Sequence, residues 1–239
     1  MKIEIIAFNI ESCKAAQEAG AHRIELCASP GEGGTTPSHA FIKAARKILE
    51  IELYIMIRPR GGDFLYSENE LNIMQNDAAF CKQVGCDGIV TGVLKEDGTP
   101  DMQINEKILQ VAYPLEATFH RAFDRCINPL ESLETIIQTG FERVLTSGQR
   151  PTAMDGKGLI SDLIKAKGND IIIMPGSGIN AGNILEIAQD TGAREFHSSA
   201  SILKKSEMKY KNEMMNEDLA FITVNKKEVE EMAKKLAGI

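Results

Sequence analysis

The sequence lacks several features that would place it in a familiar functional class. No apolar run approaches the roughly 18 residues that cross a bilayer, and residues 1–6 read as a strand without the length or cleavage site of a secretory signal. Lysine and arginine do not cluster, and the net charge of −7 is unsuited to a nucleic-acid backbone. We therefore expect a cytoplasmic protein with no membrane and no nucleic-acid partner.

Disulfide and dithiol patterns are also missing. The 5 cysteines are an odd, scattered set, which favours reduced thiols in a cytosol. No CxxC pair occurs. Cys81 and Cys86 straddle the end of a predicted helix, and their spacing indicates a two-ligand metal clip only weakly.

Motifs for covalent catalysis and dinucleotide binding are absent as well. No lysine ends a predicted central strand, which disfavours a Schiff-base aldolase, and no GxSxG turn occurs. Residues 7–10, Ala-Phe-Asn-Ile, follow the first strand where an open dinucleotide-binding sheet would normally carry GxGxxG.

The sequence does contain a regular alternation of strand and helix patterns. Strands are predicted over 2–7, 22–27, 51–58, 87–93, 113–119, 142–146, 170–175 and 194–197. Helices are predicted over 10–19, 36–48, 68–84, 103–111, 129–139, 152–167, 181–190 and 226–237. This order predicts an α/β fold with one domain over 1–239, a closed parallel (β/α)8 TIM barrel.

The end of the chain departs from this rhythm. Residues 1–201 supply the barrel strands and the helices between them, 202–225 form a long loop, and 226–237 form the last helix. A connection of that length is typical of a functional flap, an oligomer contact or a partly disordered segment. We expect an oligomer contact, and hence a homodimer or a higher homo-oligomer.

Several predicted strands alternate apolar with ionisable residues, so the ionisable set should line the barrel interior. Members low on their strands should form ion pairs in the barrel floor. They are Glu4, Arg23, Glu116 and Glu195. Members at the carboxyl ends lie at the rim, where barrel enzymes act. They are Glu25, Cys27, Arg58, His120 and His197.

Two polar turns at this rim suggest acid–base and anion-binding roles. Arg58 and Arg60 offer planar donor forks for carboxylate or phosphate, and Asp63 could act as a base or brace an arginine. After the fifth strand, His120 is a candidate acid–base residue, Arg121 adds a cation, and Asp124 either orients His120 or caps a turn.

Three later turns predict an anion site, because loops after strands seven and eight of such barrels commonly bind phosphate. Their candidate residues are Ser147, Gly148, Gly176, Gly178, His197 and Ser199. Two different metal sites are possible interpretations of the rim residues. Glu25, His120 and His197 could hold zinc, manganese or iron(II), and Cys27 with Cys126 could offer thiolates to copper(I).

Seven segments of the chain resemble the CutC family, and the resemblance extends over residues 1 to about 200. They are Arg23–Cys27, Glu32–Ser38, Met56–Phe64, Thr118–Asp124, Arg143–Gln149, Met174–Gly178 and Glu195–His197. The resemblance implies a cytoplasmic, oligomeric (β/α)8 barrel associated with copper homeostasis. The family cysteine that best fits a copper ligand corresponds to Cys27.

Two functional hypotheses follow. The first is copper(I) binding or handling, with Cys27 as the main thiolate and Cys126 or a rim histidine assisting. The second is an enzyme acting on a small anionic, possibly phosphorylated, substrate, in which Arg58 and Arg60 clamp the anion while Glu25 or His120 moves protons.

Overall fold

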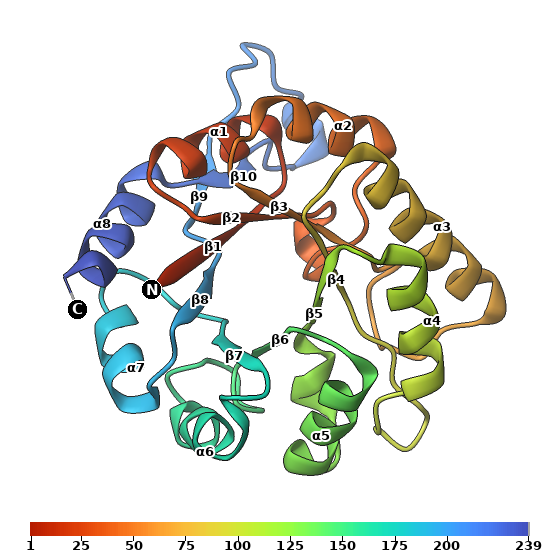
Figure 1. Ribbon diagram of the computed structural model, residues 1–239. Coiled ribbons are helices and arrows are strands. Elements are labelled where there is room, and N and C mark those ends of the chain that lie inside the picture. Colours follow the sequence, from red (N-terminus) through yellow and green to blue (C-terminus); the bar gives the residue numbers. More distant parts are fainter. Residues whose placement is uncertain (239) are drawn as a thin grey trace.

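Eight parallel strands form the centre of the structure, a computed structural model that describes residues 1–238 (Figure 1). The strands are β1 (Lys2–Ala7), β2 (Arg23–Leu26), β3 (Glu52–Met56), β4 (Gly88–Thr91), β5 (Glu116–Phe119), β6 (Arg143–Thr146), β7 (Ile172–Pro175) and β8 (Glu195–Ser198). The helices around them are α1 (Ile10–Glu18), α2 (His39–Ile48), α3 (Glu68–Val84), α4 (Met102–Ala112), α5 (Pro129–Thr139), α6 (Lys157–Lys167), α7 (Ile184–Thr191) and α8 (Lys226–Ala237). The predicted (β/α)8 barrel is confirmed.

The order of the strands explains the closed shape. Hydrogen-bonded pairing runs β7-β6-β5-β4-β3-β2-β1-β8, and β7 packs beside β8 to bring the two ends of the sheet together. In this register Glu4 of β1 lies opposite Arg23 on one side and His197 on the other. Residues distant in the sequence therefore meet at one height in the barrel.

The alternation along the strands separates two buried layers. Ile3, Ile5, Ile24 and Leu26 point outward and are fully buried against the helices. The residues between them on β1 and β2 point inward, including Glu4 and Glu25. Strand periodicity thus gives an apolar outer core and an ionisable interior.

The predicted ion pairs in the barrel floor are present. Arg23 contacts Glu4 at 2.5 Å and Glu195 at 2.7 Å, and both of its partners are largely buried. Arg143, which the sequence analysis did not place in this set, contacts Glu195 at 2.7 Å. Glu116 joins through Arg143 at 3.4 Å, although its side chain is 54% exposed at the lower edge. Pairing offsets part of the cost of burying these charges.

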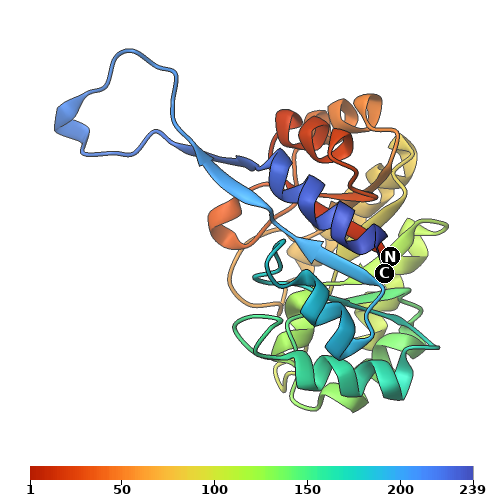
Figure 2. The same ribbon diagram turned by 90° about the vertical axis from the view of Figure 1, so that its left-hand side faces the viewer.

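The segment predicted as a long loop contains further structure. Strands β9 (Ser201–Lys204) and β10 (Phe221–Val224) pair antiparallel and carry residues 205–220 away from the barrel as an arm (Figure 2). Ser12 on α1 hydrogen-bonds to Thr223 and Val224, which anchors the base of the arm. No helix within residues 1–238 has the length and apolar character needed to cross a membrane.

Candidate functional site

A cavity of about 300 Å³ opens at the carboxyl-terminal end of the barrel. Its wall includes Glu25, Arg58, His120 and His197, which come from β2, the loop after β3, the end of β5, and β8. The structure therefore brings together the four rim side chains on which the sequence analysis depends. Arg121, Gly178 and Ser199 also lie on the wall.

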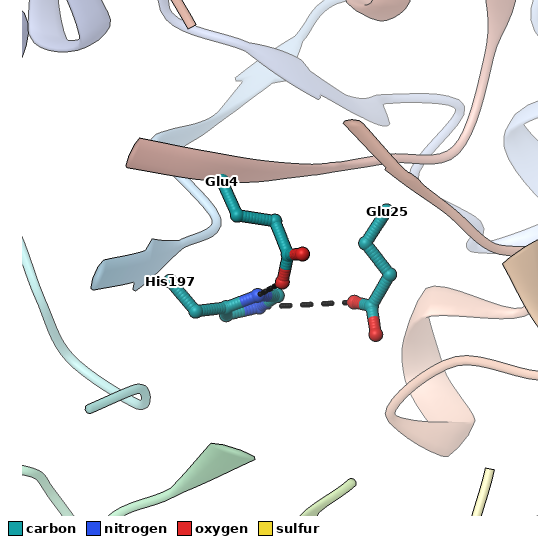
Figure 3. Close-up of side chains that lie close together, drawn as sticks. All are labelled: Glu4, Glu25 and His197. Atoms are coloured by element: carbon teal, nitrogen blue, oxygen red, sulfur yellow. Dashed lines mark hydrogen bonds and ion pairs between the residues drawn. The ribbon is translucent and has the colours of Figure 1, made fainter. Parts of the chain in front are cut away.

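Glu4, His197 and Glu25 form a chain of polar contacts (Figure 3), in which His197 and Glu25 also line the cavity. His197 Nδ1 lies 2.7 Å from Glu4 Oε1, and His197 Nε2 lies 3.8 Å from Glu25 Oε2. Burial acts to raise the pKa of Glu4, but Arg23 and His197 outweigh it and lower that pKa to about 2. Glu4 is consequently ionised, and it accepts a hydrogen bond from the Nδ1–H group of His197.

Glu25 and His197 shift each other's pKa values. Burial outweighs the attraction of His197 and raises the pKa of Glu25 to about 7, with the charge of Glu4 adding to the rise. Burial lowers the pKa of His197, but Glu25 and then Glu4 outweigh it, so that the net pKa is raised. Glu25 Oε1 has no hydrogen-bond partner in the described part of the chain. A carboxyl titrating near neutral pH beside an imidazole suits acid–base chemistry.

His120 lies on the wall of the cavity and is neutral. Its Nδ1 accepts the backbone N–H of Ala122 at 3.3 Å, so the proton of the neutral ring lies on Nε2. Burial and then the charge of Arg58 lower the pKa of His120 to about 3. Nε2 is buried and, over residues 1–238, unpartnered. His120 is therefore a neutral hydrogen-bond donor, not a base, at this nitrogen.

Arg58 adds a positive charge to the rim and also holds two rim loops together. Its Nη1 donates to the carbonyls of Glu32 and Gly34, at 2.7 and 2.9 Å, and its Nη2 donates to the carbonyl of Gly62 at 3.0 Å. The guanidinium also lies 5.0 Å from the centre of the Phe64 ring. The fork is thus largely used within the protein, and only its buried Nε lacks a partner in the described residues.

Arg60 and Asp63 are not brought into the cavity. Arg60 contacts Glu70 at 2.6 Å and Asp63 at 3.0 Å, and the Asp63 side chain is 71% exposed. They form the loop-bracing pair that the sequence analysis held as the alternative to an anion clamp.

Asp124 organises the loop after β6 and does not orient His120. The carboxylate accepts hydrogen bonds from Thr146 Oγ1 at 2.6 Å, from the Ser147 backbone at 3.0 Å and from the Gln149 backbone at 3.2 Å. It also contacts Arg121 Nε at 2.7 Å. The turn-capping alternative describes this residue, and Arg121 is held at the edge of the cavity as a result.

The candidate residues of the glycine-containing turns fall into two groups, those required by close packing and those that line the cavity. A Cβ on Gly148 would lie 2.2 Å from the Gly156 carbonyl, and one on Gly176 would lie 2.5 Å from Leu145 Cδ1. Both glycines are required by close packing. Gly178 and Ser199, in contrast, line the cavity, while Ser147 is engaged with Asp124.

The two candidate copper thiols lie in different layers. Cys27 is fully buried inside the barrel with Tyr54, Met56 and Val90. Cys126 belongs to the apolar core between sheet and helices, where its thiol donates to the Ala122 carbonyl at 3.7 Å. The structure does not bring the predicted pair together.

Two contributors to the site were missed. Glu4 was placed in the barrel floor, but its second oxygen reaches His197, which only the strand register could reveal. The Phe64 ring contacts the His120 ring at an interplanar angle of 52°, with ring centres 4.7 Å apart. Its place in a glycine-rich rim loop was the available signal.

The protein is a (β/α)8 barrel whose cavity, at the carboxyl ends of the strands, is lined by ionisable side chains. Some buried polar atoms of these side chains have no hydrogen-bond partner within residues 1–238. A profile of the CutC family matches residues 1–202. A CutC family protein from Pasteurella multocida is 48% identical over 219 residues, 91% of this chain and 90% of its own length. The human protein named copper homeostasis protein cutC homolog is 44% identical over 210 residues, 88% of this chain and 77% of its own. The chain belongs to the CutC family.

Solved structures agree with this assignment. A crystal structure of CutC from Streptococcus agalactiae has a TM-score of 0.80 at 32% identity and covers 83% of this chain and 98% of that one. Phosphoribosylanthranilate isomerase from Thermotoga maritima, at 11% identity and a TM-score of 0.62 with all of both chains covered, shares the fold alone.

Proposed function

We propose that this protein takes part in copper homeostasis by binding copper(I) through Cys27. Family membership supports the role, since a relative at 44% identity is named for copper homeostasis. The observation that carries the proposal is that Cys27 and Met56, two residues with soft sulfur atoms, belong to one buried cluster inside the barrel. Both side chains lie against Gly34, since a Cβ there would lie 3.1 Å from Cys27 Sγ and 3.6 Å from the methyl carbon Cε of Met56. Thiolate and thioether are the ligands that select copper(I).

Cys27 must lose its proton to act as a ligand, and Glu25 is placed to receive it. Burial and then the charge of Glu25 raise the pKa of the Cys27 thiol well above its usual value. Glu25 itself titrates near pH 7. Because Cys126 occupies another layer, we propose Met56 in its place as the second donor.

Anaerobic titration with copper(I) against a chromophoric chelator tests this proposal. We expect binding at the barrel mouth to be lost in Cys27→Ser, weakened in Met56→Leu and kept in Cys126→Ser. Unchanged affinity and stoichiometry in Cys27→Ser would reject Cys27 as a ligand.

A second candidate function is supported by the unsatisfied polar atoms around the cavity. Glu25 Oε1, His120 Nε2 and Arg58 Nε are buried without partners within residues 1–238. Leaving such groups unpaired costs roughly 1–3 kcal/mol each, which a bound polar ligand would recover. We propose that a small anionic molecule binds here, with His120 and Arg58 donating to it and Glu25 moving its proton.

Metabolites that remain bound during purification, identified by mass spectrometry, test this candidate. A small anion enriched on the wild-type protein should be lost with His120→Ala and with Arg121→Ala. It should be retained with Arg60→Ala, because that arginine lies outside the cavity. Retention in all three variants would remove the cavity as the binding site.

We also propose that the protein is a cytoplasmic homo-oligomer assembled through the arm. Apolar side chains on the arm are exposed, including Met208 at 67%, Tyr210 at 73% and Met214 at 90%. Replacing residues 205–220 by a short Gly-Ser turn should reduce the mass measured by light scattering to that of a monomer while leaving the barrel folded. An unchanged mass would exclude the arm as the oligomer contact. Cell fractionation tests the proposed cytoplasmic location.

A further inference from the structure

A pair of cysteines lies away from the barrel mouth, where α3 leads into β4. Cys81 is in the last turn of α3, and Cys86 lies just before β4 begins at Gly88. Both are buried, at 0% and 4% exposure. This junction is at the amino-terminal end of the strands, opposite the cavity, and the proposed function makes no use of it.

The helix ending brings these two residues into contact. The Cys86 N–H donates to the Cys81 carbonyl at 3.1 Å, and the Gly85 N–H donates to the Lys82 carbonyl at 3.2 Å. Gly85 has the left-handed φ of +78° that this ending needs. The two bonds define a Schellman motif, in which the side chains at these two positions commonly touch. Cys81 and Cys86 therefore occupy the two positions of this motif whose side chains commonly touch, although their spacing along the chain indicates a metal clip only weakly.

The surroundings combine an apolar environment with a nearby cation. Both cysteines belong to the buried hydrophobic core of the barrel. The charge of Arg46 favours the thiolate form of Cys86, while Asp87 opposes it. Arg46 is held nearby by Asp87 at 2.5 Å and by the Leu49 carbonyl at 2.6 Å.

We propose that Cys81 and Cys86 form a two-coordinate site for a soft monovalent metal ion, copper(I), separate from Cys27. Two adjacent sulfurs in an apolar setting match the preference of copper(I) for thiolates. Binding releases the two thiol protons to water and leaves one net negative charge, which Arg46 partly offsets. No electron transfer is involved.

The experiment isolates this pair in a Cys27→Ser background, using copper(I) alone as the probe with anaerobic chelator competition. We expect one equivalent to remain bound in Cys27→Ser. It should be lost when either Cys81→Ala or Cys86→Ala is added, and kept when Cys13→Ala, a buried cysteine on α1, is added. Loss of metal in the Cys13→Ala control as well, or no metal bound in Cys27→Ser, would overturn the proposal.

A second measurement does not depend on variants folding. In mild urea, copper(I) should protect Cys81 and Cys86 together from alkylation of the otherwise unaltered protein, as read by peptide mass spectrometry. Equal alkylation with and without metal would refute the site. So would a pair recovered as a disulfide that takes up no copper. If Cys27 does not bind copper(I), the chelator competition and the alkylation measurement still test the Cys81–Cys86 site.

Discussion

Glu4 links the barrel floor to the cavity, and neutralising it tests both roles. Glu4→Gln keeps the shape of the side chain but removes the charge that Arg23 and His197 face. The pKa of this buried carboxyl falls from 4.5 to about 2 in the folded protein. At about 1.4 kcal/mol per pKa unit, the ionised form stabilises the fold by about 3 kcal/mol at pH 7. We expect Glu4→Gln to lower the free energy of unfolding by about that amount.

Urea unfolding at several pH values is the assay, and Glu52→Gln is the matched control. Glu52 contacts the same Arg23 at 3.1 Å, but its side chain is 37% exposed, so its loss should cost no more than about 1 kcal/mol. A carboxyl with a lowered folded-state pKa stabilises above its unfolded value and loses that effect as the pH falls. The deficit of Glu4→Gln should therefore shrink below pH 4.5 and fall to less than half by about pH 3. Equal, small losses in both variants, or a deficit independent of pH, would refute the reasoning.

Three further predictions follow from single contacts. Glu25→Gln should lower the pKa of His197, measured by NMR of the ring protons, because it removes the largest attraction that raises it; an unchanged titration contradicts the contact. Gly88→Ala should cost about 1–3 kcal/mol in urea unfolding, since its Cβ would lie 2.5 Å from the Tyr54 ring; a neutral effect would mean that the ring moves freely. Asp124→Ala should cost roughly 2–4 kcal/mol by the same measurement and loosen the loop after β6, since several donors lose a charged acceptor; a loss below about 1 kcal/mol would contradict this bracing role.

Much of the barrel could be predicted because its signals are local. Ser67 and Glu70 mark the start of α3 by a capping box, which the structure contains. The start of α6 was placed too early, since residues 152–156 form a turn in which Thr152 and Asp155 hydrogen-bond to each other. The arm strands were missed because β9 and β10 lie outside the core and pair only with each other.

The candidate site was predictable in composition but not in detail. Alternation on β2 and β8 correctly turned Glu25 and His197 inward, where they lie on the cavity wall. The same reasoning could not separate Arg58, whose fork is taken up by carbonyls, from a free anion clamp. Hydrogen bonds to loop backbones depend on the path of the loops, which residue types do not specify.

Local periodicity and motif identity were enough to predict the alternating strands and helices, the inward-facing ionisable residues and the family. The pairing of charges and the position of each proton depend on contacts that exist only in the folded barrel. Glu4 and His197 are 193 residues apart, and their 2.7 Å contact exists because β1 and β8 meet when the sheet closes. Proton affinities in a buried site follow such distances and the loss of water, and both arise only when the barrel forms.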